Sequence, residues 1–308
     1  MQTKKNSWFV VVNPMAGSGK SKALWNKIKA TLESAGLVFE YALSEYAGHE
    51  SVLSREAALG GYRQIISVGG DGTIQKVVNG VYSQRKISPK LFVIGVIACG
   101  TGNDWIKTHN IPLDYKKAVQ VIVNKKIKAQ DLGKLQISGK KNKTLYFINY
   151  AGAGFDCFVL SRLYRYKRFG ALSYFLCAII NFMRFKNLKI TIVLDSATVE
   201  ADVFLLGIGL CSFTGGGMQL TQNADPFDEL FDITIAQDFT KIDILRNLPR
   251  LFNGELFKDR KVFTYRSKKI CLMSDSGGGV LSQADGEILE NGCLNYSIVP
   301  AGFRFCSF

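Results

Sequence analysis

Three short apolar runs in the first third of the chain each end in a turn that contains glycine, and this alternation constrains the fold more than any other feature. The runs cover residues 8–12, 64–68 and 91–98. After the first two turns, apolar side chains recur at helical spacing, over residues 24–35 and 74–81. Short buried strands that alternate with amphipathic helices predict an open α/β sheet, with its ligand site outside the carboxyl ends of the strands.

The pattern changes near residue 127 to short alternating runs rich in Phe and Tyr, which predict antiparallel strands. These runs cover residues 144–150, 189–194, 203–210, 231–236 and 261–265. A chain of 308 residues also exceeds the usual size of one domain. We therefore predict an α/β plus all-β protein. An N-terminal open α/β sheet covers residues 1–126, and a C-terminal β-sandwich-like domain covers residues 127–308, whose last residues could pack back on the first domain.

A formal net charge of +14 and an isoelectric point near 9.4 predict an anionic partner, which could be nucleic acid, nucleotide or a lipid surface. The seven cysteines are scattered and none is spaced as CxxC, which favours reduced structural thiols. The apolar run before Asn13 is too short for the core of a secretory signal. We therefore expect a cytoplasmic protein.

A basic and aromatic segment, residues 161–185, interrupts the strand pattern of the second domain. Its most apolar part, residues 171–185, is shorter than the roughly 20 residues that cross a bilayer, and Arg184 interrupts it. The basic and aromatic residues of this region include Arg162, Tyr164, Arg165, Tyr166, Lys167, Arg168, Tyr174, Phe175, Arg184 and Lys186. Such a segment suits peripheral contact with an anionic membrane surface, and a core helix with solvated flanks is the alternative.

The turn after the first strand, residues 13–21, is made mostly of small residues and opens the first helix. It is not a P-loop, because Pro14 stands where that motif needs its first glycine. It is not a GxGxxG turn either, because Lys22 stands at the third glycine position. The glycines still allow successive backbone N–H groups at the helix start to face a phosphate, and a plain strand-to-helix connection is the alternative.

The second turn, residues 69–73, places three glycines around one carboxylate, Asp71. Glycine in place of alanine costs about 0.5–1 kcal/mol of stability, so this many glycines indicate a ligand close to the backbone. A carboxylate beside phosphates would be repelled without a cation, so Asp71 implies Mg²⁺ held directly or through water. The third turn, residues 99–104, adds a hydroxyl, an amide and a carboxylate. The three turns are predicted to converge on one nucleotide.

Together these motifs resemble the diacylglycerol kinase catalytic family, in its soluble bacterial lipid kinase branch, with the sphingosine kinases as more distant relatives. The resemblance covers nearly the whole chain: NPMAGSG near the start, GGDGT at 69–73, GTGND at 100–104, TGGGM at 214–218, an acidic loop at 225–232 and ADGE at 284–287. It implies an enzyme that uses ATP and Mg²⁺ to transfer the γ-phosphoryl group of ATP to the hydroxyl of diacylglycerol or a similar lipid.

The resemblance also implies nucleotide contacts from the glycine turns and from Ser44, whose hydroxyl stands where the family usually has threonine. The implied contacts are Asn13, Gly17, Ser44, Gly69, Gly70, Asp71, Gly72, Thr73, Ile74, Gln75, Thr101 and Asn103. A structural Mg²⁺ loop of the family maps onto Asp225, Asp228 and Leu230, two of which would act through backbone carbonyls. Glu229 stands where the family has glycine, which leaves the occupancy of this loop open.

By the same resemblance, Glu287 is the general base that takes the proton from the lipid hydroxyl, and Asp71 and Asp285 are the other catalytic candidates. An alcohol nucleophile gains from a carboxylate within hydrogen-bond reach, while positioning and Mg²⁺ supply most of the barrier reduction. Asp285 could orient Mg²⁺ or the base, and an extended segment would point both carboxylates to one face. An acidic β-turn with Gly286 at its tip is the alternative.

Two other function classes stay open on the sequence. An NAD kinase-like phosphotransferase also combines GGDGT with a β-rich second domain, although the NP turn and ADGE favour the lipid kinase. A basic nucleic-acid-binding protein would fit the charge, but the sequence has no recognition-helix, zinc-finger or RNA-binding aromatic motif. We therefore expect a lipid substrate and no nucleic-acid partner. Exposed edge strands leave a homodimer open.

Overall fold

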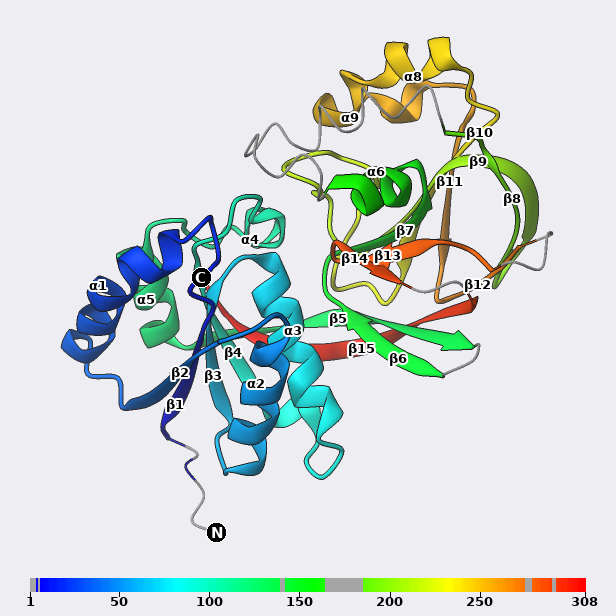
Figure 1. Cartoon of the computed structure of the whole chain (residues 1–308). Coiled ribbons are helices and arrows are strands. Elements are labelled where there is room, and N and C mark those ends of the chain that lie inside the picture. Colours follow the sequence, from blue (N-terminus) through cyan, green and yellow to red (C-terminus); the bar gives the residue numbers. More distant parts are fainter. Residues whose placement is uncertain (1–3, 5, 139–141, 164–184, 275–278, 290–291) are drawn as a thin grey trace. The chain divides into compact units, whose positions relative to one another are not determined.

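The computed structural model describes residues 4, 6–138, 142–163, 185–274, 279–289 and 292–308 (Figure 1). The chain divides into two compact units. The N-terminal unit is residues 1–132 together with Pro300–Phe308, and the C-terminal unit is Gly133–Val299. The division falls between residues 132 and 133, whereas the sequence pattern changes near residue 127.

The N-terminal unit is built around a parallel sheet. Its elements are β1 (Trp8–Val12), α1 (Lys20–Ser34), β2 (Phe39–Leu43), α2 (His49–Leu59), β3 (Gln64–Gly69), α3 (Asp71–Ser83), β4 (Val93–Ala98), α4 (Asp104–Thr108), α5 (Tyr115–Asn124) and the end of β15 (Cys293–Ser307). The strand order is β2-β1-β3-β4, and β15 adds to β4. Because these neighbours are all parallel, β1, β3 and β4 end at the same edge of the sheet, where Val12 pairs with Val68 and Gly69 with Ala98.

Helices cover both faces of this sheet, because its central strands are apolar on both sides. Val10, Val11 and Val12 of β1 are all buried. On one face, α1 and α5 contribute buried residues such as Trp25 and Ile122 to one apolar cluster. On the other face, α2 and α3 pack on each other (Figure 1). Such double coverage is typical of parallel sheets in α/β proteins.

The C-terminal unit is built mainly from antiparallel strands. Its elements are the end of β5 (Lys126–Ser138), which begins in the N-terminal unit, then β6 (Lys143–Phe147), β7 (Tyr150–Gly154), α6 (Phe155–Leu163), β8 (Leu188–Leu194), β9 (Thr198–Gly209), β10 (Phe231–Gln237), α8 (Lys241–Asn247), α9 (Arg250–Asn253), β11 (Val262–Ser267), β12 (Lys269–Ser274), β13 (Ser282–Ala284), β14 (Glu287–Leu289) and the start of β15. Neighbouring strands follow the order β14-β13-β7-β9-β8-β12-β15, with β10 and β11 branching from β9 and with β6 on β5. Aromatic rings fill the interior, where Phe147 stacks on Phe231 with centroids 5.7 Å apart.

These two units confirm the predicted fold class, an open α/β sheet followed by a β-sandwich-like unit. The runs predicted as strands over residues 8–12, 64–68 and 91–98 form β1, β3 and β4, with a short 3-10 helix at Pro89–Leu91 ahead of β4. Periodicity did not predict β2, because this edge strand exposes Glu40 and Tyr41 and so lacks an apolar run. The α8–α9 pair was not predicted either.

Two other sequence predictions meet the limits of the described residues. Most of the proposed membrane-contact segment, residues 164–184, lies outside them. Within the part of the chain that the structure describes, no helix is long and apolar enough to cross a membrane. The described cysteines, which exclude Cys177, form no disulfide.

Candidate active site

The three glycine turns of the N-terminal unit meet through their backbones. A Cβ atom on Gly17, in the first turn, would lie 2.1 Å from the carbonyl oxygen of Cys99, at the end of β4. A Cβ atom on Gly100, in the third turn, would lie 2.5 Å from Cα of Gly70, in the second. Side chains at these positions would therefore drive the turns apart. The three turns therefore meet, and the physical basis of their contact is the close approach of residues without a Cβ atom. Their convergence on one nucleotide stays a prediction.

Side chains from the first two turns also brace each other. Asn13 Nδ2 donates to Thr73 Oγ1 at 3.2 Å, and Asn13 Oδ1 accepts from the backbone N–H of Met15 at 3.0 Å. A Cβ atom on Gly69 would lie 2.2 Å from Thr73 Oγ1. The sequence-predicted residues Asn13, Gly69 and Thr73 therefore form one packed junction between β1 and β3.

Two helices begin at this junction without a side-chain cap. The residues that precede α1 and α3 are Gly19 and Gly70, which carry no side chain that could accept from the first helical N–H groups. In α1, the N–H groups of Lys20 and Ser21 already donate to the carbonyls of Gly17 and Ala16 at 3.2 Å. At the start of α3, the first N–H groups and the positive end of the helix dipole form a favourable environment for phosphate oxygens. The exposed space beside Gly72, which has no heavy atom within 4 Å of a Cβ position, leaves room for a ligand at α3.

Asp71 ties the second turn to the third. Its Oδ2 accepts from the backbone N–H of Asp104 at 2.7 Å and its Oδ1 from that of Trp105 at 3.3 Å, so the carboxylate caps the short helix α4. Burial raises the pKa of Asp71 to about 6, and repulsion from Asp104 adds to this, while the two N–H donors oppose it. A cation near Asp71 would relieve this unfavourable environment, and the carboxylate has lone pairs left to bind one. The described residues contain no group of three or more His, Cys, Asp or Glu side chains that could hold a metal, so Mg²⁺ binding by Asp71 stays a prediction.

Asn103 offers a buried acceptor beside the same turns. The residue has a positive φ of 50°, and its Nδ2 donates to the carbonyl of Gly100 at 2.8 Å. Its Oδ1 is buried and has no hydrogen-bond partner among the described residues. An unsatisfied buried oxygen is rare in folded proteins, so a donor such as a ribose hydroxyl would fit here. Thr101, in the same turn, is exposed.

Ser44 lies at the end of β2, on the other side of β1 from the second turn. Its backbone N–H donates to Val12 O at 2.8 Å, and its hydroxyl donates to Glu50 Oε1 at 3.3 Å. Both side chains are buried, and Glu50 Oε2 has no partner among the described residues. Sequence reasoning missed Glu50, since an acid in the first turn of a helix is an ordinary surface feature until its burial is known.

Ile74 and Gln75 differ from the other predicted nucleotide contacts. Their side chains are 2% and 1% exposed, so they belong to the interior of the N-terminal unit. The backbone N–H of Ile74 already donates to Gly70 O at 3.3 Å. A role for these two residues is therefore to fix the start of α3 from within.

In the C-terminal unit, the ADGE motif forms a tight hairpin. Asp285 and Gly286 have φ values of 47° and 82° and form the turn between β13 and β14, where Ala284 pairs with Glu287. The extended arrangement that would put both carboxylates on one face is therefore absent from this hairpin. Asp285 accepts from the backbone N–H groups of Ile148, Asn149 and Tyr150 at 2.8, 3.1 and 3.1 Å. Its carboxylate thus holds the hairpin on the start of β7, and Glu287 stays partly exposed.

Two further residues brace this hairpin and were missed by the sequence analysis. Gln283 Oε1 accepts from the N–H of Gly286 at 2.9 Å, and its Nε2 donates to Asp156 Oδ2 at 3.2 Å. Asp156 is buried, which raises the pKa of its carboxyl. Since Gln283 and Asp156 are 127 residues apart, spacing along the sequence carries no signal of their contact.

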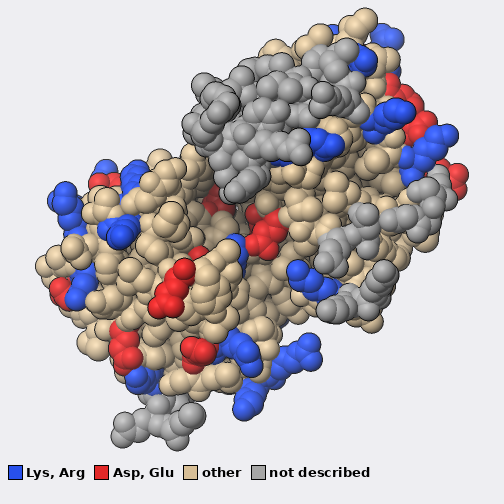
Figure 2. All heavy atoms as spheres, viewed as in Figure 1, with Lys and Arg blue, Asp and Glu red and all other residues tan. Residues whose placement is uncertain are grey.

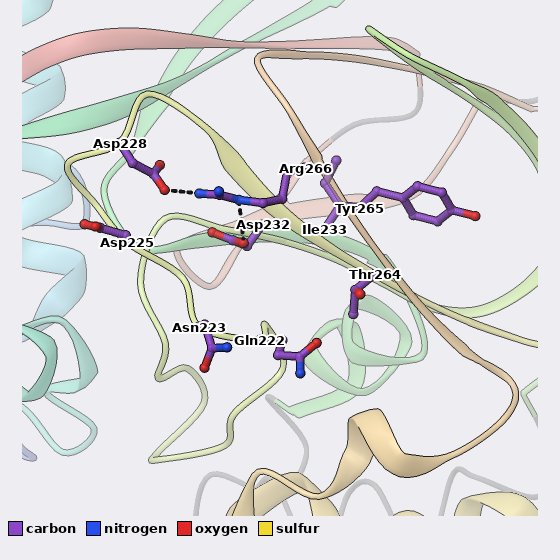
Figure 3. A pocket seen from close by; sticks show the side chains of 9 residues that line it. All are labelled: Gln222, Asn223, Asp225, Asp228, Asp232, Ile233, Thr264, Tyr265 and Arg266. Atoms are coloured by element: carbon purple, nitrogen blue, oxygen red, sulfur yellow. Dashed lines mark hydrogen bonds and ion pairs between the residues drawn. The ribbon is translucent and has the colours of Figure 1, made fainter.

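The acidic loop of the C-terminal unit borders a polar cavity of about 570 Å³ (Figure 3). The cavity is lined by Gln222, Asn223, Asp225, Asp228, Asp232, Ile233, Thr264, Tyr265 and Arg266. Asp225 and Asp228 each accept from a backbone N–H two residues further on, at 3.0 Å. Arg266 contacts Asp228 through Nη2 and Asp232 through Nε, the latter at 3.2 Å.

This arrangement does not fit the Mg²⁺ ion predicted for the loop. Arg266 occupies the carboxylate oxygen of Asp228 that its own loop leaves free. Leu230 is not among the residues that line the cavity. The residues that the structure describes contain no group of three or more His, Cys, Asp or Glu side chains that could hold a metal. Metal binding by Asp225, Asp228 and Leu230 therefore stays a prediction that requires Arg266 to move.

Comparison with known proteins accounts for both units. Residues 7–135 match the diacylglycerol kinase catalytic domain, and residues 149–306 match the YegS C-terminal NAD kinase beta sandwich-like domain. The chain belongs to the diacylglycerol kinase family. The likeness to NAD kinases is limited to the β-sandwich-like match over residues 149–306. The catalytic match is to diacylglycerol kinases, which favours a lipid kinase over the NAD kinase alternative.

Relatives in the diacylglycerol kinase family match over most of their length. A diacylglycerol kinase of Staphylococcus carnosus is 28% identical over 267 residues, which cover 86% of this chain and 84% of that protein. One of Mycobacterium tuberculosis is 27% identical over 297 residues, which cover 96% of this chain and 93% of that protein. A crystal structure of a diacylglycerol kinase from Bacillus anthracis aligns over 100% of this chain and 98% of its own, with a TM-score of 0.75 and 21% identity. This last likeness shows a shared fold.

Proposed function

We propose that this protein is an ATP-dependent lipid kinase that transfers the γ-phosphoryl group of ATP to the hydroxyl of diacylglycerol or a similar lipid. The observation that carries the proposal is the backbone contact among the three glycine turns at the ends of β1, β3 and β4. Such a junction, with the uncapped start of α3 beside it, suits a polyphosphate better than a neutral ligand. Membership of the diacylglycerol kinase family supports a lipid as the acceptor.

The nucleotide contacts follow from the N-terminal unit. The N–H groups at the start of α3 bind phosphate oxygens, and Asn103 Oδ1 accepts from a hydroxyl of the nucleotide. Asp71 binds the Mg²⁺ that accompanies ATP, directly or through water. When bound, this ion neutralises charge on the phosphates during transfer. Asp71 also keeps the third turn in place through α4, so it serves the site even before nucleotide binds.

The acceptor side of the reaction rests on Glu287 in the C-terminal unit. Its carboxylate accepts the proton of the lipid hydroxyl, whose oxygen attacks the γ-phosphorus of ATP, and ADP leaves with the electrons of the broken P–O bond. Asp285 does not touch the substrate in this proposal. It holds the hairpin that carries Glu287 through its three backbone N–H contacts.

A kinase assay on a panel of acceptors tests the proposal. The protein is incubated with Mg²⁺ and γ-labelled ATP and with dispersed diacylglycerol, phosphatidylglycerol, a sphingoid base or NAD, and the products are identified by mass. We expect label on one of the lipids, and the Asp71→Asn variant provides the inactive control. Label that appears on NAD alone would replace the lipid kinase by the NAD kinase alternative.

A further inference from the structure

The helix α8 exposes two of its apolar side chains and buries two of its polar ones. Ile242 and Leu245 are 75% and 57% exposed, while Asp243 and Asn247 on the same helix are buried. Surface helices of globular proteins normally turn their apolar stripe toward the core and their polar residues toward water. Because Ile242 and Leu245 are three residues apart, they lie on one face of the helix and form a common apolar surface.

The polar inner side of α8 is fully used in holding the helix. Asp243 forms a capping box with Thr240 and binds Lys261 Nζ at 2.7 Å, and the Lys261 hydrogen bond holds the pKa of Asp243 well below its usual range. Asn247 Nδ2 donates to Asp259 Oδ2 at 2.7 Å. The helix is thus anchored by hydrogen bonds and ion pairs, and by Ile244, which packs against an apolar cluster of the unit. Ile242 and Leu245 are not needed to attach it to the unit, so their exposure calls for another reason.

Charge around α8 and α9 is positive on balance, and the one acid of this segment that is not buried, Glu255, forms an ion pair with Lys258. Residues 240–261 contain six basic and three acidic side chains. Two of the acids, Asp243 and Asp259, are buried, whereas Lys241 and Arg260 are exposed. The next helix, α9, adds Phe252, which is 49% exposed. Figure 2 shows blue Lys and Arg side chains, with red Asp and Glu side chains among them, at the α8 end of the C-terminal unit.

We propose that this surface, formed by Lys241, Ile242, Leu245, Phe252 and Arg260 and called here the α8–α9 surface, docks on an anionic lipid bilayer. Exposed apolar side chains with basic neighbours are typical of segments that lie in the membrane interface. The inference deepens the proposed function, since a long-chain lipid acceptor resides in a bilayer. A second copy of this chain is a poorer occupant, because it would bring the same basic residues and a formal charge of +14 against this surface.

Vesicle sedimentation without nucleotide tests the docking surface directly. The vesicles are phosphatidylcholine alone, or phosphatidylcholine with about one third phosphatidylglycerol. We expect the wild-type protein to sediment with the anionic vesicles and to bind them less well at high salt. The double variant Ile242→Ser/Leu245→Ser is expected to bind at least about tenfold more weakly, because two apolar side chains no longer enter the interface.

A matched control uses apolar side chains that are equally exposed elsewhere. Val38 and Leu113 in the N-terminal unit are 69% and 65% exposed, so the double variant Val38→Ser/Leu113→Ser loses comparable apolar surface. It should bind anionic vesicles as the wild type does. Equally weakened vesicle binding in both double variants would overturn the proposal for the α8–α9 surface. Wild-type protein that does not bind anionic vesicles would overturn it as well.

An introduced fluorophore gives an independent readout. The native tryptophans, Trp8, Trp25 and Trp105, are all buried in the N-terminal unit. In the variant Ile242→Trp, fluorescence from the new side chain should shift to the blue when anionic vesicles are added, because the indole leaves water. An unchanged spectrum at saturating vesicles would overturn insertion at this position.

Two measurements separate this inference from its alternatives. Light scattering that shows a wild-type dimer and a monomeric Ile242→Ser/Leu245→Ser variant, with vesicle binding unchanged, would assign the surface to a second copy and overturn the proposal. In detergent-dispersed diacylglycerol, the double variant should keep wild-type turnover, because no bilayer has to be reached. Wild-type protein that binds anionic vesicles but phosphorylates no lipid would refute the proposed function and leave the docking surface standing.

Discussion

At the scale of single residues, the N-terminal unit holds two titrating side chains whose effects on stability oppose each other. Burial raises the pKa of Asp71 to about 6, and burial lowers the pKa of His109 to about 4, although its hydrogen bond to Gln130 works against the shift. Between about pH 4 and 6 the folded state therefore holds an extra proton on Asp71 and lacks one on His109. Acidification stabilises the fold through Asp71 and destabilises it through His109.

The variant Asp71→Asn separates these two effects. Without the Asp71 proton, the free energy of unfolding should fall more steeply than in the wild type as the pH drops from about 6 to about 4, by up to about 1.4 kcal/mol per pH unit. Urea unfolding followed by tryptophan fluorescence measures the free energy of unfolding at each pH, because the tryptophans lie in this unit. His109→Gln should change the slope in the opposite direction. Parallel pH profiles for Asp71→Asn and the wild type would contradict the shifted pKa of Asp71.

Glu287→Gln is expected to lower kcat by roughly 10²- to 10⁴-fold and to change the affinity for ATP little. The amide keeps the size of the side chain but cannot take the proton of the lipid hydroxyl. Steady-state kinetics with varied ATP and lipid measures both effects. The control is Glu200→Gln, an exposed acid on β9 of the same unit, which should behave as the wild type. Full turnover in Glu287→Gln would require another base.

At the scale of elements, the contact between α2 and α3 depends on one glycine. A Cβ atom on Gly80 would lie 2.0 Å from Ser54 Oγ and 2.2 Å from the backbone oxygen of Ser51. Alanine would favour the helix by about 1 kcal/mol, but the backbone of α2 cannot move aside cheaply. The close approach should therefore outweigh the helix propensity.

Gly80→Ala is accordingly expected to destabilise the N-terminal unit by about 1–3 kcal/mol. The matched control is Gly72→Ala in the same helix, where a Cβ atom would meet nothing within 4 Å. This control should be neutral or slightly stabilising. Thermal unfolding of the two variants and the wild type measures the difference in stability. If Gly80→Ala is more stable than the wild type, α2 has shifted to make room for the new methyl group.

In the acidic loop, the guanidinium of Arg266 contacts Asp228, a carboxylate for which the family resemblance implies a metal ion. Arg266 on β11 pairs in the sheet with Asp232 on β10 and also contacts Asp228. Opposite charges at directly paired strand positions stabilise a sheet. Glu229, in the position of the family glycine, has a φ of 63° and its own ion pair with Lys268 at 3.0 Å.

The unfolding temperature of the wild type, measured without nucleotide, should therefore respond little to Mg²⁺ or to a chelator. Arg266→Gln should lower it and make it rise again with added Mg²⁺, because Asp228 and Asp232 are then free to bind the ion. Lys268→Gln, which removes an exposed ion pair, should have a small effect and gain no response to Mg²⁺. A strong response in the wild type that is lost in Asp228→Asn would show that the metal displaces Arg266.

At the scale of the whole molecule, the last residues of the chain complete the first unit. Arg304 and Phe305 of β15 pair in parallel with Val93 and Ile94 of β4, and Phe305 is buried against Trp105, with ring centroids 4.9 Å apart. Tyr82 Oη donates to the carbonyl of Gly302 at 2.7 Å. The N-terminal unit therefore cannot reach its full stability until the end of the chain is in place.

Phe305→Ala should destabilise the N-terminal unit by about 3–5 kcal/mol, since it leaves a cavity beside Trp105. Urea unfolding followed by tryptophan fluorescence measures this loss of free energy. A large loss is expected even though Phe305 is the fourth residue from the end of the sequence. Phe308→Ala, at an exposed position, should cost little. If both variants unfold at the same urea concentration, the end of β15 contributes less than its burial implies.

The sequence by itself determined the fold class, the three glycine turns and the family, because each depends on residues close together in the chain. The hydrophobic periods of strands and helices, and the turns that need glycine, can be recognised within windows of about ten residues. The same locality allowed Asp71 and Asn103 to be singled out as candidates before any contact was known, whereas Glu287 followed from the family resemblance.

Only the tertiary structure decided how the acidic side chains are used. Asp285 accepts from N–H groups 135 to 137 residues away, and Arg266 contacts Asp228 across 38 residues. The exposure of Ile242 and the burial of Glu50 likewise depend on which elements pack around them. Local spacing does not encode such contacts, because they arise only when distant segments are brought together by the burial of apolar surface.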